Sequence, residues 1–222
     1  MNSTSKKNKI CAVIPFYNEA ETIHSISVET LNYVDQLILV NDGSTDQSLK
    51  NIPDDDRIII INSTSNNGKG SALKIGFLKS LELGFEYTVS LDADFQHEPK
   101  WIPSLTDALK NYDIVIGNRL NDISSMPIQR IASNKLTSML LSLKTGTRII
   151  DSQCGFRAFR TKVLQNILPS YNGYEAESEM LILAARQKLK VGSVNISTIY
   201  GNEKSKIKPV KTILGFVRVL FI

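Results

Sequence analysis

Hydrophobic residues in this chain occur in short runs, and each run ends at a cluster of polar residues. The first run, residues 10–15, leads into a polar turn at 17–19 and then into a helix-like stretch that continues to Leu31. The same unit recurs through the first half of the chain, which predicts alternating strands and helices. Further strands are predicted at 37–40, 58–61, 87–91 and 114–116, and the helices between them end at Asn51 or occupy 71–83 and 99–109.

Alternation of apolar strands with helices is typical of an α/β fold, in which helices on both faces cover a mainly parallel, Rossmann-like sheet. Ligands of such sheets bind at the carboxyl ends of the strands, and each polar cluster falls at one of these ends. Beyond residue 121 the pattern is looser. It predicts helices at 128–143, 162–168 and 177–187, a strand at 191–196 and irregular structure from 144 to 159. No internal repeat or linker divides the sequence, so we predict one domain for residues 1–222.

The composition, with 42% hydrophobic and 22% charged residues, is that of an ordinary globular protein and argues against disorder. Cys11 and Cys154 are far apart and lack a CxxC partner, so we predict buried free thiols rather than a zinc site or a disulfide. The basic N-terminal segment leads into only a short apolar run, unlike a secretory signal. We therefore expect the protein to remain in the cytoplasm.

The net charge is only +4, but basic residues are concentrated near the C-terminus, where residues 201–222 hold five of them against one acidic residue, Glu203. This bias favours an anionic partner such as a phosphate or a membrane surface. No arginine-dense, aromatic-rich stripe accompanies it, so we expect no nucleic-acid partner.

The last segment, 209–222, has the pattern of an amphipathic helix. Its apolar face consists of Val210, Ile213, Leu214, Val217, Leu220 and Phe221. Because Arg218 interrupts it and it is shorter than the roughly twenty apolar residues that span a bilayer, we expect it to lie on a membrane surface. Packing against the domain or against a dimer partner is the alternative.

The strongest candidate for chemistry is Asp92-Ala93-Asp94-Phe95-Gln96, which directly follows an apolar run. Two carboxylates and an amide oxygen, from Asp92, Asp94 and Gln96, are hard ligands that suit Mg²⁺ or Mn²⁺. Such an ion would bridge the two phosphates of a nucleotide-diphosphate sugar and neutralise the leaving diphosphate. A solvated acidic turn is the alternative, and the position at a strand end favours the metal.

Asp42 ends a different strand, where its carboxylate can accept hydrogen bonds from a base or a ribose, although an Asx-Gly sequence is also an ordinary turn. Gly68-Lys69-Gly70 lacks the spacing of a P-loop and is read as a flexible helix start. The first strand is not followed by GxGxxG either. Kinase and dehydrogenase functions are therefore disfavoured.

Several segments, taken in order, resemble glycosyltransferase family 2, and within it the polyprenyl (dolichol) phosphate mannosyltransferase-like branch. They are residues 13–19, 40–44, 92–97, 117–119, 155–157 and 205–206, in the order in which the family has them. The chain departs from that branch at Asn41, where an aspartate is usual, and at 200–203, which replaces an arginine-led run.

The resemblance implies the glycosyltransferase A fold and inversion at the anomeric carbon. It also implies a donor site made of Pro15, Tyr17, Glu19, Val40, Asp42, Asp92, Ala93 and Gln96, with the metal held by Asp92, Asp94 and Gln96. By the same likeness, the acceptor phosphate would contact Arg119, Arg130, Ser133, Ser205 and Lys206. We expect Asp94, Arg119 and Arg130 to carry the catalysis.

On this basis residues 1–120 form a nucleotide-sugar-binding half, residues 121–208 an acceptor-binding half, and residues 209–222 the amphipathic helix. We expect an inverting hexosyltransferase at the cytoplasmic face of the membrane, in the synthesis of the cell envelope. A polyprenyl phosphate acceptor is already anionic and needs positioning but no general base.

Two other functions stay open. A family 2 enzyme that glycosylates a sugar or other hydroxyl in cell-surface polysaccharide synthesis would need a base, for which Glu175, Glu177 and Glu179 are candidates. The same residues are also explained as acidic side chains that stabilise a helix start. The second of these functions is that of a non-catalytic nucleotide-sugar binder.

Overall fold

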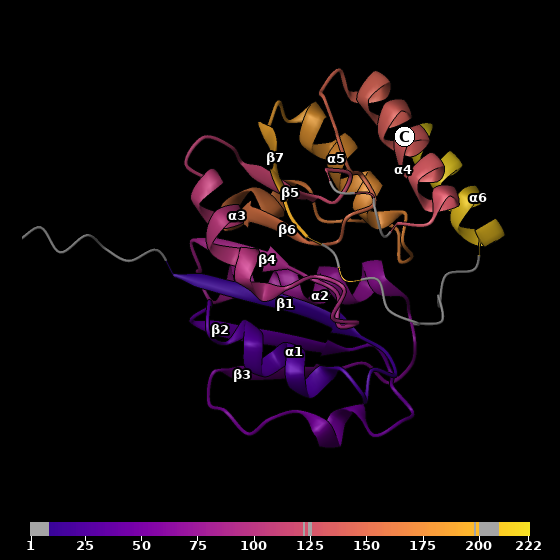
Figure 1. The fold of residues 1–222 in the computed structure, drawn as a ribbon. Helices are drawn as coiled ribbons and strands as arrows, with labels where there is room; N and C mark the ends of the chain where they lie inside the picture. The colour runs from indigo at the N-terminus through magenta and orange to yellow at the C-terminus, as the bar shows by residue number, and fades with distance from the viewer. Residues whose placement is uncertain (1–8, 122, 124–125, 198, 200–208) are drawn as a thin grey trace, which may run out of the picture.

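The computed structural model describes residues 9–121, 123, 126–197, 199 and 209–222. Within this part of the chain the strands form one seven-stranded sheet in the order β3-β2-β1-β4-β6-β5-β7 (Figure 1). The strands are β1 (Ile10–Phe16), β2 (Gln36–Asn41), β3 (Ile58–Asn62), β4 (Tyr87–Ser90), β5 (Ile114–Asn118), β6 (Arg157–Arg160) and β7 (Val191–Asn195).

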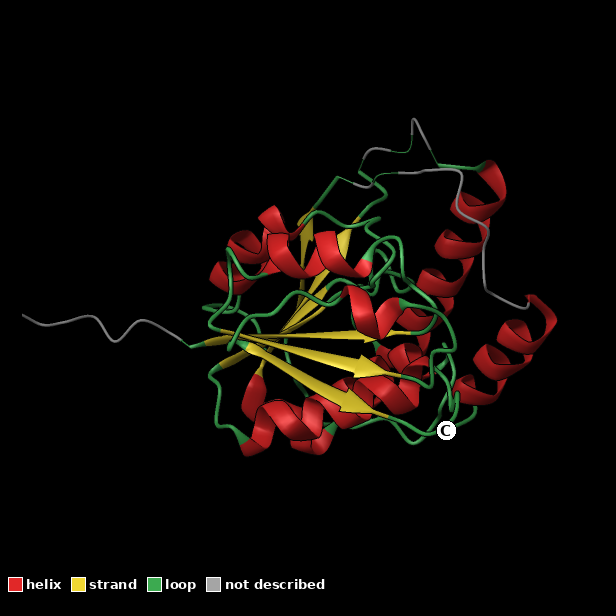
Figure 2. Cartoon of the chain, turned by 90° about the horizontal axis from the view of Figure 1, so that it is seen from below, coloured by secondary structure: helices red, strands yellow, loops and turns green. Residues whose placement is uncertain are grey.

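Helices cover both faces of this sheet (Figure 2). They are α1 (Ile23–Thr30), α2 (Lys69–Glu82), α3 (Ile102–Ala108), α4 (Ile128–Thr145), α5 (Ala176–Arg186) and α6 (Pro209–Leu220), with short 3₁₀ helices η1 (Ser48–Asn51), η2 (Pro99–Trp101) and η3 (Thr161–Asn166). Cys11, Ala12, Val13 and Ile14 of β1 are completely buried, as expected of a strand that is covered on both sides. The predicted α/β class is confirmed.

Close packing of α2 on the sheet depends on Gly76. A Cβ atom there would collide with the side chain of Val13 in β1 and come within 3.2 Å of Val40 Cγ2 in β2. The glycine therefore lets the helix backbone approach the strands, and α2 carries its first residue, Lys69, to the carboxyl end of the sheet.

The irregular structure predicted for 144–159 is wrong at its end, because Arg157–Arg160 form β6. This strand lies between β4 and β5 and is antiparallel to both, whereas the other described strand pairs are parallel. With only four residues and an arginine at each end, β6 has no apolar run that periodicity could detect. It brings the loop before it, residues 151–156, against the end of β4.

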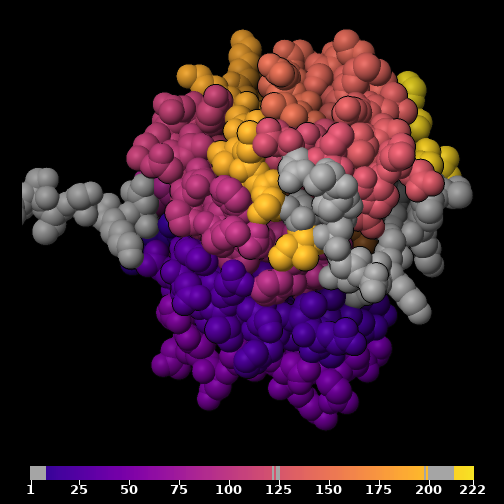
Figure 3. Space-filling view, viewed as in Figure 1, coloured from indigo at the N-terminus to yellow at the C-terminus, as the bar shows by residue number. Residues whose placement is uncertain are grey.

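The second half of the chain forms the side of the molecule that carries α4, α5 and α6 (Figure 1). In the space-filling view the indigo and purple residues nearest the N-terminus form the lower part of the surface, and the salmon residues of the second half form its upper right (Figure 3). The helix predicted at 209–222 is present as α6, and its Val219 is buried. Among the described residues, no helix combines the length and hydrophobicity that a membrane crossing requires.

Candidate functional site

The loops that follow β1 and β2 are joined to each other at the carboxyl end of the sheet. The backbone N–H of Asn18 donates to Ser44 Oγ at 3.0 Å, and the N–H of Thr45 donates to Asn18 Oδ1 at 2.8 Å. Asn18 has a positive φ of 54°, a conformation that asparagine tolerates better than most residues. The N–H of Glu19 donates to Ser48 Oγ at 2.8 Å, so both loops form one wall.

Pro15 and Val40, two of the predicted donor residues, are neighbours in the register of β1 and β2. Val40 is completely buried with its side chain toward Gly76 of α2, so it supports this end of the sheet from within. Tyr17 and Glu19 are half-buried in the loop beyond β1. The predicted nucleotide-binding residues are thus brought together at one edge of the sheet.

Asp42 is buried and holds the loop that precedes α2. Its two carboxylate oxygens accept the backbone N–H groups of Asn67 at 2.9 Å and Gly68 at 2.8 Å. Gly68 has a φ of +104°, which favours glycine at this point. The carboxylate therefore shapes this wall of the candidate donor site, and any bond to a base or ribose would use its remaining lone pairs.

Asn41 explains one departure from the family pattern. Its amide nitrogen donates to Asn62 Oδ1 at 3.0 Å, and its amide oxygen accepts the N–H of Ser44 at 2.8 Å. An asparagine can do both, whereas an aspartate could only accept. The asparagine at 41 is thus matched to the asparagine at the end of β3.

Asp92 follows β4 and is paired with Lys69, whose Nζ lies 2.6 Å from Asp92 Oδ1. Lys69 also lies 3.3 Å from Glu177 Oε1 of α5. Burial opposes the charge on Lys69, but Asp92 and Glu177 outweigh it and raise the pKa of the ammonium group. Burial likewise disfavours the Asp92 anion, yet Lys69, His97 and Arg119 together hold the pKa of Asp92 below its usual range.

Asp94 and Gln96 lie in the tight turn that follows. Asp94 Oδ1 accepts the N–H of Gln96 at 3.1 Å, and Phe95 between them has a φ of 60°. The turn keeps both residues half-buried beside Asp92, while Ala93 is buried beneath it. The predicted metal residues are therefore neighbours at the end of β4.

The predicted metal ligands fit Mg²⁺ or Mn²⁺ in their chemistry, because they offer carboxylate and amide oxygens and no thiolate or imidazole. Within the described part of the chain, no three histidine, cysteine or acidic side chains are already gathered into a metal-binding cluster. Lys69 occupies one oxygen of Asp92. Asp92, Asp94 and Gln96 would hold a divalent ion together with oxygens of its ligand.

Gly155 lies directly against the ion pair of Asp92 and Lys69. The sequence did not reveal this contact. A Cβ atom on Gly155 would be 2.7 Å from Asp92 Oδ2 and 2.8 Å from Lys69 Nζ. Ser90 Oγ donates to the Gly155 carbonyl at 3.0 Å and fixes the loop against β4. The only available signal was the glycine of the motif 155–157, whose partner lies more than sixty residues earlier.

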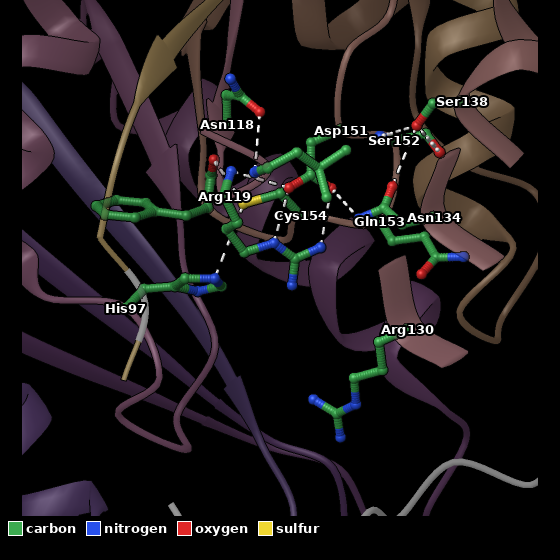
Figure 4. Close-up of polar contacts among 12 residues, drawn as sticks. His97, Asn118, Arg119, Arg130, Asn134, Ser138, Asp151, Ser152, Gln153 and Cys154 are labelled. Carbon is green, nitrogen blue, oxygen red and sulfur yellow. Dashed lines mark hydrogen bonds and ion pairs between the residues drawn. The ribbon is translucent and has the colours of Figure 1, made fainter. Parts of the chain in front are cut away.

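Arg119, after β5, is fixed by Asp151 in a bidentate ion pair (Figure 4). Nε lies 2.8 Å from Asp151 Oδ2 and Nη2 lies 2.9 Å from Oδ1, while Asn134 of α4 donates to Oδ1 at 2.6 Å. The Asp151 side chain is fully buried; burial favours its neutral form, but Arg119 holds its pKa below the usual range. The guanidinium is therefore held in one orientation.

Arg130 and Ser133 are exposed in the first turns of α4, where Ser133 Oγ donates to the Arg130 carbonyl at 3.2 Å. Figure 4 shows the Arg130 side chain extending from α4 below the Arg119–Asp151 pair in this view. Ser205 and Lys206, also predicted to contact the acceptor, lie outside the described residues.

Arg157 and His97 are both buried, and their polar contacts are with other parts of the protein. Arg157 is buried and donates to the carbonyl oxygens of Ser152, Cys154 and Glu177, each at 2.8 Å. Asp151 pairs with Arg119 and leaves Arg157 to these carbonyl oxygens. Burial lowers the pKa of His97 to about 4, and its Nε2 lies 3.8 Å from the Cys154 thiol, so it is neutral near pH 7. Both cysteines are buried and free, as predicted.

The candidate bases differ in their surroundings. Glu179 accepts the N–H groups of Ser170 and Tyr171 at 2.8 and 3.0 Å, which gives it a structural role. Glu177 is paired with Lys69. Glu175 is half-buried beside α6, where a Cβ atom on Gly215 would lie 2.8 Å from its Oε2.

Comparison with known proteins agrees with this geometry. The family model described as glycosyl transferase family 2 matches residues 11–168. The UDP-N-acetylglucosamine–dolichyl-phosphate N-acetylglucosaminyltransferase of Methanococcus voltae is 32% identical over 93% of this chain and 92% of its own length. The undecaprenyl-phosphate 4-deoxy-4-formamido-L-arabinose transferase of Proteus mirabilis is 31% identical over 92% of this chain and 65% of its own length.

Solved structures show the same fold. Glucosyl-3-phosphoglycerate synthase from Mycobacterium tuberculosis, in complex with Mn²⁺ and uridine-diphosphate-glucose, superposes with a TM-score of 0.73. It is 20% identical, and the match covers 97% of this chain and 80% of that protein. The sheet is therefore that of the glycosyltransferase A fold. The relatives confirm the resemblance to the polyprenyl phosphate branch, and the chain is a glycosyltransferase that belongs to glycosyl transferase family 2.

Proposed function

We propose that this glycosyltransferase moves a sugar from a nucleotide-diphosphate sugar to a polyprenyl phosphate, with inversion and with Mg²⁺ or Mn²⁺. The observation that carries the proposal is the loop 151–157, which touches both sides of the site. Asp151 orients Arg119, and Gly155 lies against Asp92. Arg119 is also close enough to Asp92 to help lower its pKa. A guanidinium suited to a phosphate thus neighbours the carboxylates suited to a metal diphosphate.

In this proposal residues 1–120 bind the donor and residues 121–208 bind the acceptor. The loops after β1 and β2, closed by Asp42, would orient the nucleotide. A bound divalent ion would supply neutralisation of the diphosphate leaving group. Arg119 and Arg130 would attract the acceptor phosphate and hold one of its oxygens in line with the anomeric carbon.

The surroundings of the acidic residues favour a phosphate over a hydroxyl acceptor. A hydroxyl must lose a proton to a base, but Glu179 is occupied by backbone N–H groups and Glu177 by Lys69. A polyprenyl phosphate oxygen is already anionic and needs no base. Both curated relatives also carry a polyprenyl phosphate in their names.

The test is donor consumption with Mn²⁺ and a panel of UDP- and GDP-sugars, with and without a short polyprenyl phosphate. We expect the lipid phosphate to accelerate consumption strongly and Asp94→Ala to slow transfer by about a hundredfold or more. Arg130→Met should raise the acceptor KM, with Lys74→Met, which alters an exposed lysine of α2, as the control. Glycosylation of hydroxyl acceptors alone would overturn the acceptor and turn attention to Glu175. Failure to consume any donor would overturn the donor proposal.

We further propose that α6, together with α4, rests on an anionic lipid surface at the cytoplasmic face of the membrane. Both helices lie on the same side of the molecule in Figures 1 and 2. Their exposed apolar side chains are Ile128, Leu136, Met139 and Leu143 of α4 and Ile213, Leu214 and Val217 of α6, and Phe221 follows α6 directly. The two helices contain the basic residues Arg130, Lys135, Lys144, Lys211 and Arg218 and no acidic residue. Apolar contact combined with positive charge suits an anionic bilayer.

Sedimentation with vesicles that contain an anionic phospholipid tests this contact. The double variant Ile213→Ser, Phe221→Ser should no longer sediment with the vesicles. A control double variant, Leu49→Ser with Ile60→Ser, alters exposed apolar residues elsewhere and should sediment like the wild type. Equal sedimentation of both variants would contradict the proposal. A dimer that dissociates in the first variant without any vesicle binding by the wild type would show that a second copy covers these helices.

A further inference from the structure

Lys69 lies between two carboxylates that come from opposite halves of the chain. Its Nζ is 2.6 Å from Asp92 Oδ1 and 3.3 Å from both carboxylate oxygens of Glu177. The ring centre of Tyr174 is 5.9 Å away and closes the cluster from another direction. The Lys69 side chain is 15% exposed and that of Glu177 9%, so water screens these charges poorly.

The predicted helix start at residues 68–70 is present as the first turn of α2, and it holds Lys69 in this position. The N–H of Gly70 donates to the Asn172 carbonyl at 2.7 Å. A Cβ atom at Gly68 or Gly70 would collide with the backbone oxygens of 171–172. The two glycines therefore let the helix start pack directly on the loop before α5, which leaves the lysine side chain facing the cluster.

We propose that Lys69 is a built-in counter-cation that sets the metal affinity of the site. Asp92 and Glu177 carry two negative charges, and Lys69 neutralises one of them at the first carboxylate of the metal motif. A divalent ion at Asp92 is repelled by the ammonium group, so it binds weakly by itself. The diphosphate of the donor adds negative charge that attracts both cations, so the metal binds tightly only together with the nucleotide.

This inference rests on the proposed donor function and adds an order of binding to it. Holding back the metal until the nucleotide arrives couples the two ligands, and such coupling is reciprocal between them. Lys69 acts through Asp92 and is therefore a positioning residue. Its effect is visible in binding without turnover.

The experiment measures free aqueous Mn²⁺ by electron paramagnetic resonance during titration of the protein, with and without UDP or GDP. In the wild type we expect weak binding that the nucleotide tightens. Lys69→Met should tighten Mn²⁺ binding without nucleotide by about tenfold and reduce the nucleotide effect by a similar factor. Lys74→Met, which alters an exposed lysine of α2, should behave like the wild type.

Glu177→Gln gives the opposite test. The substitution removes one negative charge, so Asp92 becomes the remaining carboxylate partner of Lys69. Mn²⁺ should therefore bind more weakly than in the wild type. Damage to the fold does not produce opposite shifts in two variants of one cluster. If Lys69→Met binds Mn²⁺ like Lys74→Met, the inference is wrong. If Lys69→Met does not fold, unchanged or tighter binding by Glu177→Gln overturns it. Absence of Mn²⁺ binding by the wild type with every nucleotide would instead overturn the donor proposal.

Discussion

The proposed donor side and the proposed acceptor side of this site owe their rigidity to different kinds of residue. On the donor side, polar residues follow apolar strands of a parallel sheet, and the strands beneath them supply the rigidity. On the acceptor side, buried charged groups supply it. Asp151 and Arg157 are both buried in the loop and short strand that separate α4 from η3, and each is satisfied by hydrogen bonds.

This difference teaches where each side is sensitive to mutation. Glu19, Asp94 and Gln96 at the strand ends are half-buried and can find new partners in water. A buried charge that loses its partner keeps the full cost of desolvation. We therefore expect charge-removing substitutions to be severe on the proposed acceptor side and mild at the half-buried positions of the proposed donor side, apart from the residues proposed to bind the metal.

The largest loss of stability should come from Arg157→Met. The substitution leaves the carbonyl oxygens of Ser152, Cys154 and Glu177 without their donor in a buried place. We expect the free energy of unfolding to fall by about 3–5 kcal/mol. Urea denaturation measures it. Arg160→Met, in the same strand but with a partly exposed side chain, is the control and should cost much less. Equal losses would mean that the buried carbonyls are not what Arg157 stabilises.

Asp151→Asn should have the next largest effect and a distinct pH dependence. Removal of the charge takes from Arg119 its buried carboxylate partner, which should cost about 2–3 kcal/mol near pH 7 and raise the acceptor KM more than it lowers kcat. Burial opposes the anion, but Arg119 keeps the pKa of Asp151 below its ordinary value. The stability from this pair is therefore present above about pH 4 and is lost as the pH falls through the lower folded pKa. Unfolding of both proteins from pH 3 to 8 should show their difference shrinking only at the acid end, and a constant difference would contradict this account.

The same difference explains what could be predicted from the sequence. Strands β1 to β5 were predicted because apolar residues there lead into a polar turn, and the proposed donor residues were predicted because they stand in or next to those turns. The strand β7 was predicted as well, although glycine and serine interrupt its apolar residues. The strand β6 was missed because two of its four residues are arginines. The roles of Lys69, Gly155 and Asp151 were also missed. Their partners lie up to 108 residues away, so no local pattern records the contact.

Gly155→Ala should disturb the contact between the loop 151–156 and the ion pair of Asp92 and Lys69. The new methyl group would stand within 2.8 Å of both Asp92 and Lys69, so the ion pair must separate or the loop must move. We expect a loss of about 1–3 kcal/mol in stability and at least a tenfold slower transfer. Denaturation and donor-consumption assays measure the two effects. Wild-type transfer at wild-type stability would show that the loop has room for the methyl group and that Gly155 does not set the distance between the two sides.

The smallest effect should come from the donor-side pair Asn41 and Asn62. In Asn41→Asp the carboxylate still accepts the N–H of Ser44, and rotation of the Asn62 amide can restore a donor to it, so the loss should stay below about 1 kcal/mol. Asn62→Asp should be equally mild, because Asn41 already donates to that position. The double variant sets two carboxylates against each other and should lose about 1 kcal/mol more than the sum of the single variants. A double-mutant cycle by urea denaturation measures this coupling. Additive losses would mean that the two side chains do not depend on each other, and the asparagine at 41 would then need another explanation than its match to β3.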